Sequence, residues 1–206
     1  MRSATMEDLP EIVNFIYERF SNLEHFNFLT EHMDHSEEVL KKFIETELLL
    51  FLKYGKVQIY GEPIVGMISS IPSKKLTLFR QFLYSLPSRK ILKELPVEDR
   101  RRLLKKNKLV AEIHHTLPWH KKYTKNSYYI AQIAVAKEAK GTGVMRKLLT
   151  PIFADCQRQN MDIVLETMTE ANVPIYEHFG FKLAEIHQSQ NVPYEEYCLI
   201  KRAKKN

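Results

Sequence analysis

The stretch "SYYIAQIAVAKEAKGTGVMRKLL", residues 127–149, decides the fold of this chain. Its first nine residues are rich in β-branched and aromatic side chains, which predicts a strand over 127–135. Gly141 and Gly143, two of only six glycines in the chain, come next. An apolar face with helical spacing then begins at Val144. A glycine turn between a strand and a helix predicts backbone N–H groups that can cradle a phosphate at the helix N-terminus.

Two other phosphate motifs do not fit this turn. A Walker loop needs GxxxxGK[ST], which occurs nowhere in the sequence. The dinucleotide fingerprint needs GxGxxG, but Arg146 stands at the third glycine position. A site built from backbone amides needs no particular side chain. On the glycines alone, however, ordinary turn chemistry explains the pattern equally well.

The segments after the turn complete an α/β pattern. "MDIVLET" (161–167) is a short apolar run typical of a buried strand, and a helix separates it from the strand at 127–135. The two strands are therefore expected to be parallel and joined by a right-handed crossover. "NVPIYEHFGF" (172–181) predicts a short helix that ends at Gly180, and "KLAEIH" and "YEEYCLIK" predict two final strands.

The first half of the chain is mostly helical. We expect two helices with apolar faces over Leu9–Phe20 and Leu40–Phe51, a hairpin over about 56–71, and a helical insertion over 73–110. Thr5 and Asp8 are expected to cap the first helix, and Ser36 the second, with Glu37 and Glu38 in its first turn. The segment between these helices is expected to be an acidic loop. Pro87 should interrupt the insertion, and Pro96 should start its second helix.

These elements predict one α/β (α+β) domain over 1–206, with a mixed, twisted central β-sheet flanked by helices and the helical insertion at 73–110 before the central strand. Composition agrees, since 44% of the residues are hydrophobic and 27% are charged. The sequence has no 18-residue apolar run and no signal-peptide core at its start, so we expect no membrane span and a cytoplasmic location. Cys156 and Cys198 are expected to be reduced thiols, and Cys156 to lie in the core.

The net charge of +6 is concentrated in 98–110, 120–125 and 201–206. Such a balance suits a polyanionic partner, or it marks solvated faces. Since no aromatic stacking pattern or recognition helix accompanies these charges, no nucleic-acid partner is expected. His25, His32, Asp34 and His35 could suggest a metal site, but their spacing lacks a second pair of ligands, so no metal is expected.

"YYIAQIAVAKEAKGTGVMRKLLTPIF" (128–153) and "IVLETMTEANVPIYEHFGF" (163–181) together resemble the acyl-CoA-dependent N-acyltransferases of the GNAT superfamily. The resemblance extends over about 128–200, and "MRSATMEDLPEIVNFI" is similar to the family's opening strand and first helix. Within the superfamily, "LTP", "LET" and "NVPIYEHFGF" resemble the puromycin N-acetyltransferase-like branch. Lys140 stands where the family has Gln or Arg. Met145 stands where it has Gly or Ala, which places bulk beside the expected pyrophosphate path.

The resemblance implies a coenzyme A site within a core over 127–181. The strand ending Ile133, Ala134 and Val135 would bind the pantetheine arm through its main chain and splay from the "IVLET" strand. Asn172 would bond the arm near the thioester. Tyr176 would be the general acid that protonates the departing thiolate. The pyrophosphate would lie on the turn formed by Lys140, Gly141, Thr142, Gly143, Val144 and Met145.

The activity that the resemblance implies is transfer of an acetyl group from acetyl-CoA to a primary amine, by direct attack in a ternary complex. Glu166 is the first candidate for the base, Glu112 beside His114 and His115 is the second, and a chain of waters to solvent is equally plausible. Phe26, Phe28, His32 and Trp119 could line the acceptor side. The acceptor would be a small-molecule or peptide amine, no membrane partner is expected, and the protein would be a monomer or homodimer. A catalytically silent acyl-CoA sensor and a nucleic-acid-binding module are the alternatives.

Overall fold

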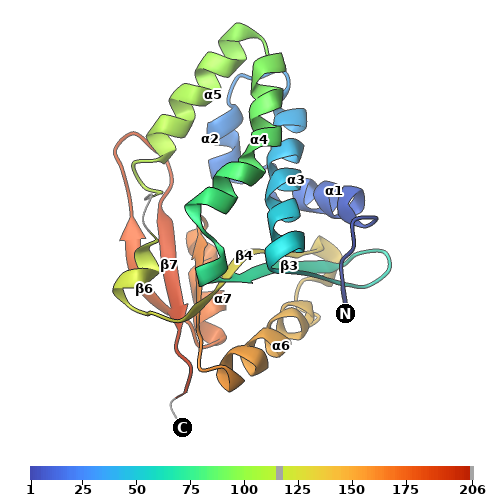
Figure 1. Cartoon of the computed structure of the whole chain (residues 1–206), viewed down its shortest axis with the longest axis vertical. Coiled ribbons are helices and arrows are strands. Elements are labelled where there is room, and N and C mark those ends of the chain that lie inside the picture. Colours follow the sequence, from blue (N-terminus) through green and yellow to red (C-terminus); the bar gives the residue numbers. More distant parts are fainter. Residues whose placement is uncertain (115–117, 205–206) are drawn as a thin grey trace.

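The computed structural model describes residues 1–114 and 118–204, and all seven described strands belong to one sheet (Figure 1). The strand order is β1-β2-β3-β4-β5-β7-β6. Among these strands only β4 and β5 are parallel neighbours, so the predicted mixed sheet is confirmed. The strands are β1 (Arg2–Ser3), β2 (Lys56–Tyr60), β3 (Gly66–Pro72), β4 (Ser127–Val135), β5 (Asp162–Thr167), β6 (Lys182–His187) and β7 (Glu196–Lys201).

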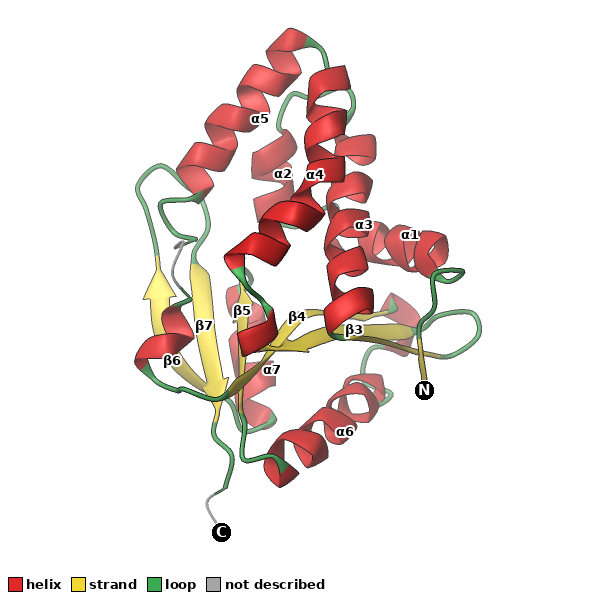
Figure 2. Cartoon of the chain, in the orientation of Figure 1, coloured by secondary structure: helices red, strands yellow, loops and turns green. Residues whose placement is uncertain are grey.

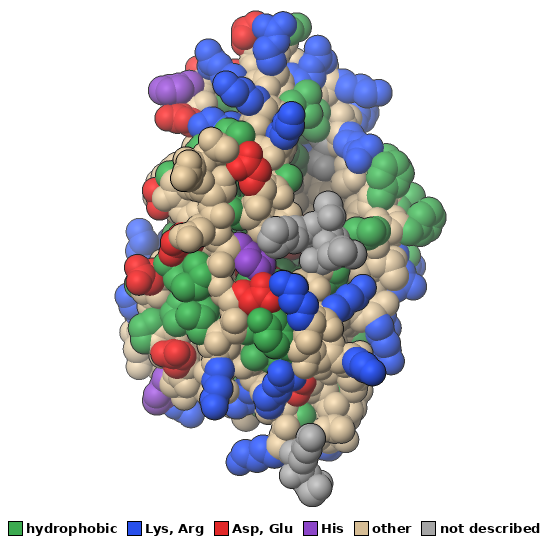
Figure 3. Space-filling model, turned by 90° about the vertical axis from the view of Figure 1, so that its left-hand side faces the viewer, with side chains coloured by type: hydrophobic (Ala, Val, Ile, Leu, Met, Phe, Trp, Pro, Cys, Tyr) green, Lys and Arg blue, Asp and Glu red, His purple; other side chains and the backbone are tan. Residues whose placement is uncertain are grey.

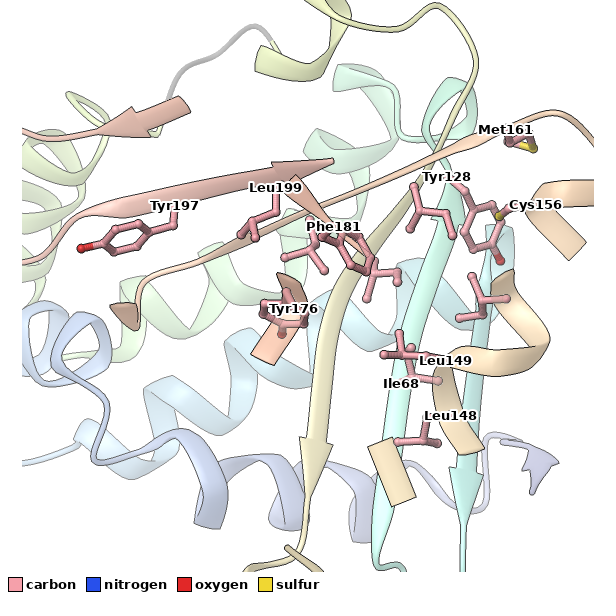
Figure 4. Close-up of a cluster of buried hydrophobic side chains, with 14 of the residues drawn as sticks. Ile68, Tyr128, Leu148, Leu149, Cys156, Met161, Tyr176, Phe181, Tyr197 and Leu199 are labelled. Atoms are coloured by element: carbon pink, nitrogen blue, oxygen red, sulfur yellow. The ribbon is translucent and has the colours of Figure 1, made fainter. Parts of the chain in front are cut away.

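Helices cover both faces of this sheet (Figure 2). One face packs on α1 and α3 through side chains such as Ile12, Leu48 and Phe51, and the other packs on α6 and α7. Figure 4 shows Tyr176, Phe181, Leu148 and Leu149 among the side chains of one buried apolar cluster, and the two leucines belong to α6. The helices are α1 (Leu9–Phe20), α2 (Glu24–Thr30), α3 (Ser36–Tyr54), α4 (Leu78–Glu94), α5 (Val97–Val110), α6 (Val144–Arg158) and α7 (Val173–His178). None of the described helices has the length and apolar character needed to cross a bilayer.

Most of the elements expected from periodicity are present, including the strand over 127–135, the hairpin and the two helices of the insertion. The prediction of a loop between α1 and α3 is wrong, because this segment contains the helix α2. His25 and Phe28 of α2 contact the ring of Tyr194, with ring centres 6.0 and 6.1 Å apart. Tertiary packing of this kind stabilises a helix that is too short to form by itself.

Three local expectations are also wrong. Asp8 precedes α1 but does not cap it, because its carboxylate accepts from the Thr5 N–H at 2.7 Å and pairs with the Arg2 guanidinium. Ser36 is the first residue of α3, and no side chain caps that helix. Pro87 does not interrupt α4, which runs on to Glu94 while packing along α3. That packing offsets the hydrogen bond that a proline removes.

Candidate active site

The parallel strands β4 and β5 separate part-way along their length. They pair only at Ser127, Tyr128 and Tyr129, so the rest of β4 has no partner on that edge. The Ala136 N–H donates to the Val65 carbonyl at the β3 side of the sheet. Because N–H directions alternate along a strand, the N–H groups of Ile133 and Val135 face the open edge. The strand expected to bind pantetheine therefore offers main-chain groups to a ligand.

A β-bulge bends β4 just beyond the point of separation. Ser70 of β3 pairs with Ile130, whereas Ser69 pairs with Gln132, so Ala131 is an extra residue on β4. A bulge of this kind increases the local twist and redirects the following side chains. It also turns Gln132 toward α3, where its amide donates to the Glu47 carboxylate at 2.6 Å.

The glycine turn follows β4 and leads into α6. Gly141 and Gly143 both have φ of +82°, a conformation that glycine adopts easily, and Gly143 is the residue before the first turn of α6. A Cβ at either glycine would meet no atom within 4 Å, so the space beside both is open. No described residue provides an acceptor for the backbone N–H groups of Gly141, Gly143, Val144, Met145 and Arg146.

The side chains of the turn leave this row of N–H groups accessible. Thr142 turns back, and its hydroxyl donates to the Ala139 carbonyl at 2.7 Å, while Lys140 is exposed. Val144 is buried and Met145 is partly buried against the same apolar cluster, so the bulk of Met145 packs on the core. The turn has unpaired N–H donors, a helix N-terminus and open space, which fits the binding of a pyrophosphate.

Tyr176 and Asn172 lie on or next to the short helix α7. The Tyr176 ring is buried against Phe181, with ring centres 5.8 Å apart. Its hydroxyl makes no hydrogen bond to any described residue, yet it is not one of the fully enclosed polar atoms. Burial raises the pKa of Tyr176 to about 12, so the phenol keeps its proton at neutral pH. The Asn172 side-chain amide donates to the Thr167 hydroxyl at 3.1 Å, which leaves its oxygen free to accept.

Three carboxylates gather near the α3 side of the sheet, and we call Glu47, Glu166 and Glu196 the carboxylate cluster. Glu166 of β5 is held by the indole N–H of Trp119. Burial, together with the nearby charge of Glu196, raises the pKa of Glu166. Glu47 of α3 is solvent-exposed, and its carboxylate accepts the amide N–H of Gln132. Glu166, with its raised pKa, is the member of the cluster best suited to accept a proton.

His114 balances part of this negative charge. Its Nδ1 lies 2.5 Å from Oε2 of Glu196, and this hydrogen bond raises the pKa of His114 to about 9. Glu196 is almost fully buried and keeps a lowered pKa because two imidazoles, His114 and His187, hydrogen-bond to it. At neutral pH the pair of His114 and Glu196 is therefore an ion pair, and Glu166 remains as the best-suited proton acceptor of the cluster.

The segment that forms most of this site matches a known protein family. Residues 105–192 match the family model described as acetyltransferase (GNAT) domain. That segment contains β4, the glycine turn, β5 and α7. The segment is thus similar to GNAT acetyltransferase domains. An uncharacterized N-acetyltransferase of Schizosaccharomyces pombe is 38% identical over 74 residues, which are 34% of this chain and 30% of that protein. The chain thus aligns with less than a third of this curated relative.

Solved acetyltransferase structures are similar over almost the whole chain. A Corynebacterium glutamicum structure described as histone acetyltransferase HPA2 and related acetyltransferase has a TM-score of 0.68 at 20% identity, covering 100% of this chain and 96% of that one. Arylalkylamine N-acetyltransferase 2 from Aedes aegypti has a TM-score of 0.64 at 14% identity, covering 98% of both. Polyamine N-acetyltransferase of Drosophila melanogaster has a TM-score of 0.61 at 12% identity, covering 97% and 96%. At these identities the likeness establishes the fold.

The other residues considered from the sequence lie in different settings. Glu112 is exposed and accepts hydrogen bonds from Ser189 and Asn191, so it anchors a loop outside the carboxylate cluster. Phe28 packs on Tyr194, and His32 is exposed at the surface. Trp119 is buried and bound to Glu166, so it both fills the core and orients the candidate base. His115 lies outside the described residues.

Sequence reasoning missed Glu47, Gln132 and Glu196 in the candidate site and its surroundings. The sequence gives little signal for Glu47, because an exposed carboxylate on an amphipathic helix is ordinary. Among the described residues, His187, Glu196 and Cys198 are the group close enough to hold a metal ion. Both ring nitrogens of His187 already lie 2.8–2.9 Å from carboxylates of Glu185 and Glu196, which is the arrangement of an ion-pair network.

Proposed function

We propose that the chain is an acetyltransferase that moves an acetyl group from acetyl-CoA to a primary amine. The observation that carries this proposal is the separation of β4 from β5 after Tyr129, followed by the open row of N–H groups at the glycine turn. In this proposal the edge of β4 at Ile133–Val135 binds the pantetheine arm as an added strand would. The turn from Lys140 to Met145 binds the pyrophosphate, and Asn172 accepts a hydrogen bond from the arm near the thioester.

The chemistry divides between the two sides of the sheet. The amine nitrogen attacks the thioester carbonyl carbon, a C–N bond forms, and the C–S bond breaks as the thiolate leaves. An N–H on the open edge of β4 stabilises the oxyanion. Tyr176 gives its proton to the departing sulfur, and its hydroxyl is available for this role because it stays protonated at neutral pH and bonds to no described residue.

The attacking amine must first lose its own proton, and Glu166 is the group proposed to accept it. Trp119 fixes one oxygen of this carboxylate, and burial raises its pKa toward the neutral range where proton transfer is efficient. The two buried cysteines do not suit a covalent route, since burial raises the pKa of Cys156 to about 12. Direct attack in a ternary complex is therefore the proposed mechanism.

Thiol release from acetyl-CoA in the presence of different amines tests this function. The panel should contain polyamines and arylalkylamines, because similar structures carry those names, and peptide amines, which the sequence leaves open as acceptors. Calorimetric titration with CoA is measured in parallel. Turnover with at least one amine supports the enzyme. CoA binding without turnover on any amine supports the acyl-CoA sensor, and no CoA binding contradicts both.

Some finer assignments stay proposals. A single domain over 1–206 with its CoA-binding core at 127–181 is one of them, and membership of the puromycin N-acetyltransferase-like branch is another. The second rests on the motifs "LTP", "LET" and "NVPIYEHFGF".

A further inference from the structure

One side of α4 exposes a row of large apolar side chains. We call it the α4 outer face. Leu78 and Phe79 are 66% and 73% exposed, and the next two turns continue the row. Residues at these spacings lie on one side of a helix. The opposite side packs on α3, where Tyr84 meets Tyr54 with ring centres 5.7 Å apart. The apolar part of the outer face consists of Leu78, Phe79, Phe82, Leu83 and Leu86.

Basic residues border this apolar row at both ends. Lys74 and Lys75 are exposed just before α4. Arg89, Lys90 and Lys93 continue the same side of the helix in its last two turns, and the Arg89 guanidinium lies 4.5 Å from the centre of the Phe82 ring. The sequence between Glu62 and Glu94 contains no acidic residue. The outer face is therefore apolar in its middle and cationic at its ends.

The positive charge of the whole chain resides in this part of the molecule. The insertion over 73–110 has twelve Lys and Arg against three Asp and Glu, whereas the whole chain has 31 against 25. The remaining residues are therefore net negative. Figure 3 shows a hydrophobic patch on its right-hand edge with Lys and Arg side chains above and below it, on the side where α4 faces the viewer in Figure 1.

Three kinds of partner could cover such a face, and charge separates them. A second copy of the chain in a two-fold dimer would bring this cationic face against itself, which like-charge repulsion opposes. A nucleic acid would pair with the basic residues but would leave the leucines without a suitable contact. An anionic lipid surface satisfies both parts, because its headgroups attract Lys and Arg while its acyl boundary takes up Leu and Phe.

We propose that the α4 outer face binds the surface of an anionic lipid membrane. The contact is peripheral, so it needs no membrane-spanning helix. It is also independent of the proposed acetyl transfer, because none of its residues belongs to the β4 edge, the glycine turn or the carboxylate cluster.

Sedimentation of the full chain with vesicles tests this proposal. Vesicles of phosphatidylcholine alone are compared with vesicles that also contain phosphatidylserine, at low and high salt. We expect the chain to bind the anionic vesicles at least about tenfold more strongly, and this preference to shrink as salt screens the charges. Equal binding to both vesicle types, or no binding to either, would overturn the proposal.

Two variants separate the apolar and the cationic contributions. Replacing Phe79 and Phe82 by serine should weaken binding about tenfold or more, since two aromatic side chains lose their apolar contact. Changing Arg89, Lys90 and Lys93 to serine should weaken it about a hundredfold, at about fivefold for each charge. The charge variant keeps every apolar residue and tests the proposal even where the aromatic variant does not fold.

The matched control replaces Leu183 and Ile186 of β6 by serine, because these side chains are also exposed, at 39% and 46%, but lie outside the insertion. This control should bind anionic vesicles like the wild type. Equal loss in the control and in the α4 variants would overturn the proposal. A chain that ignores vesicles but binds duplex RNA, or that dimerises through Phe82, would overturn it as well.

Discussion

Replacing Tyr176 with phenylalanine separates a catalytic role of this residue from a structural one. The variant keeps the buried ring and its contact with Phe181 and loses only the hydroxyl. Since that hydroxyl bonds to no described residue, no protein group is left without its partner. We therefore expect the free energy of unfolding to stay within about 0.5 kcal/mol of the wild type.

The expected effect on turnover is much larger. Burial raises the pKa of Tyr176 to about 12, so the phenol carries its proton throughout the neutral range. Without it, the thiolate must leave unprotonated or take a proton from water. Loss of a positioned general acid usually costs about 10²- to 10⁴-fold. A thiol with a pKa of about 8.5 is a fair leaving group, so we expect the lower end, about 10²-fold in kcat or roughly 2.7 kcal/mol.

Thiol release and urea denaturation measure the two quantities on the same samples. Tyr128 provides a matched control, because it belongs to the same apolar cluster and its hydroxyl accepts a bond from Ser70 Oγ at 3.3 Å. The Tyr128→Phe variant should lose about 0.5–1.5 kcal/mol of stability and keep its kcat. The reasoning is refuted if Tyr176→Phe keeps kcat within about threefold of the wild type, or if its stability falls as much as that of the control.

Three further predictions concern the turn and the carboxylate cluster. Gly66→Ala should lower stability by about 1–3 kcal/mol, because the new Cβ would lie 2.5 Å from Val144 Cγ1 and displace the first turn of α6. The same displacement should weaken CoA binding in calorimetry. An unchanged CoA affinity would show that this turn does not bind CoA. In the wild type kcat/KM should rise with pH as Glu166 ionises, with a midpoint above the usual range for Glu since its pKa is raised, and Glu166→Gln should lose this rise; an unchanged pH profile removes Glu166 from the role of base. The pKa of His114 is raised from 6.5 to about 9, so its pair with Glu196 stabilises the fold fully below about pH 6.5 and loses this contribution as pH rises through 9. Because the His114 side chain is 57% exposed, the contribution is limited to about 1 kcal/mol, and the stability gap between wild type and His114→Gln should close in urea titrations above pH 9.

The second half of the fold was predictable because its elements have a clear period and clear ends. The strand at 127–135 and the helix from Val144 follow directly from side-chain pattern and glycine chemistry. The helix α2 was not predictable in this way. It is held by ring contacts between α2 and Tyr194, a residue more than 160 positions away in the sequence. Local pattern cannot report a contact of that range.

The two sides of the candidate site also differ in whether local sequence or long-range contacts form them. The proposed phosphate side is made of consecutive residues, so the glycine turn together with the nearby motif "NVPIYEHFGF" was enough to propose it. The carboxylate cluster takes one residue each from α3, β5 and β7, and only the folded sheet brings Glu47, Glu166 and Glu196 together. The raised pKa of Glu166 arises from burial and from its proximity to Glu196, neither of which a single segment contains.

Ala131, the extra residue of the β-bulge in β4, affects both the carboxylate cluster and the open edge of β4, and the sequence contains a sign of this bulge. In a regular strand, residues three apart point to opposite faces. Ile130 and Ile133 nevertheless pack on the same apolar cluster, because Ala131 is the extra residue of the bulge. Without this residue, Gln132 would turn away from Glu47, and the N–H of Ile133 would face β3 instead of the open edge. The odd spacing of two isoleucines in "YIAQIAV" thus indicates that a single inserted residue sets both the proposed acceptor side and the proposed pantetheine side of the site.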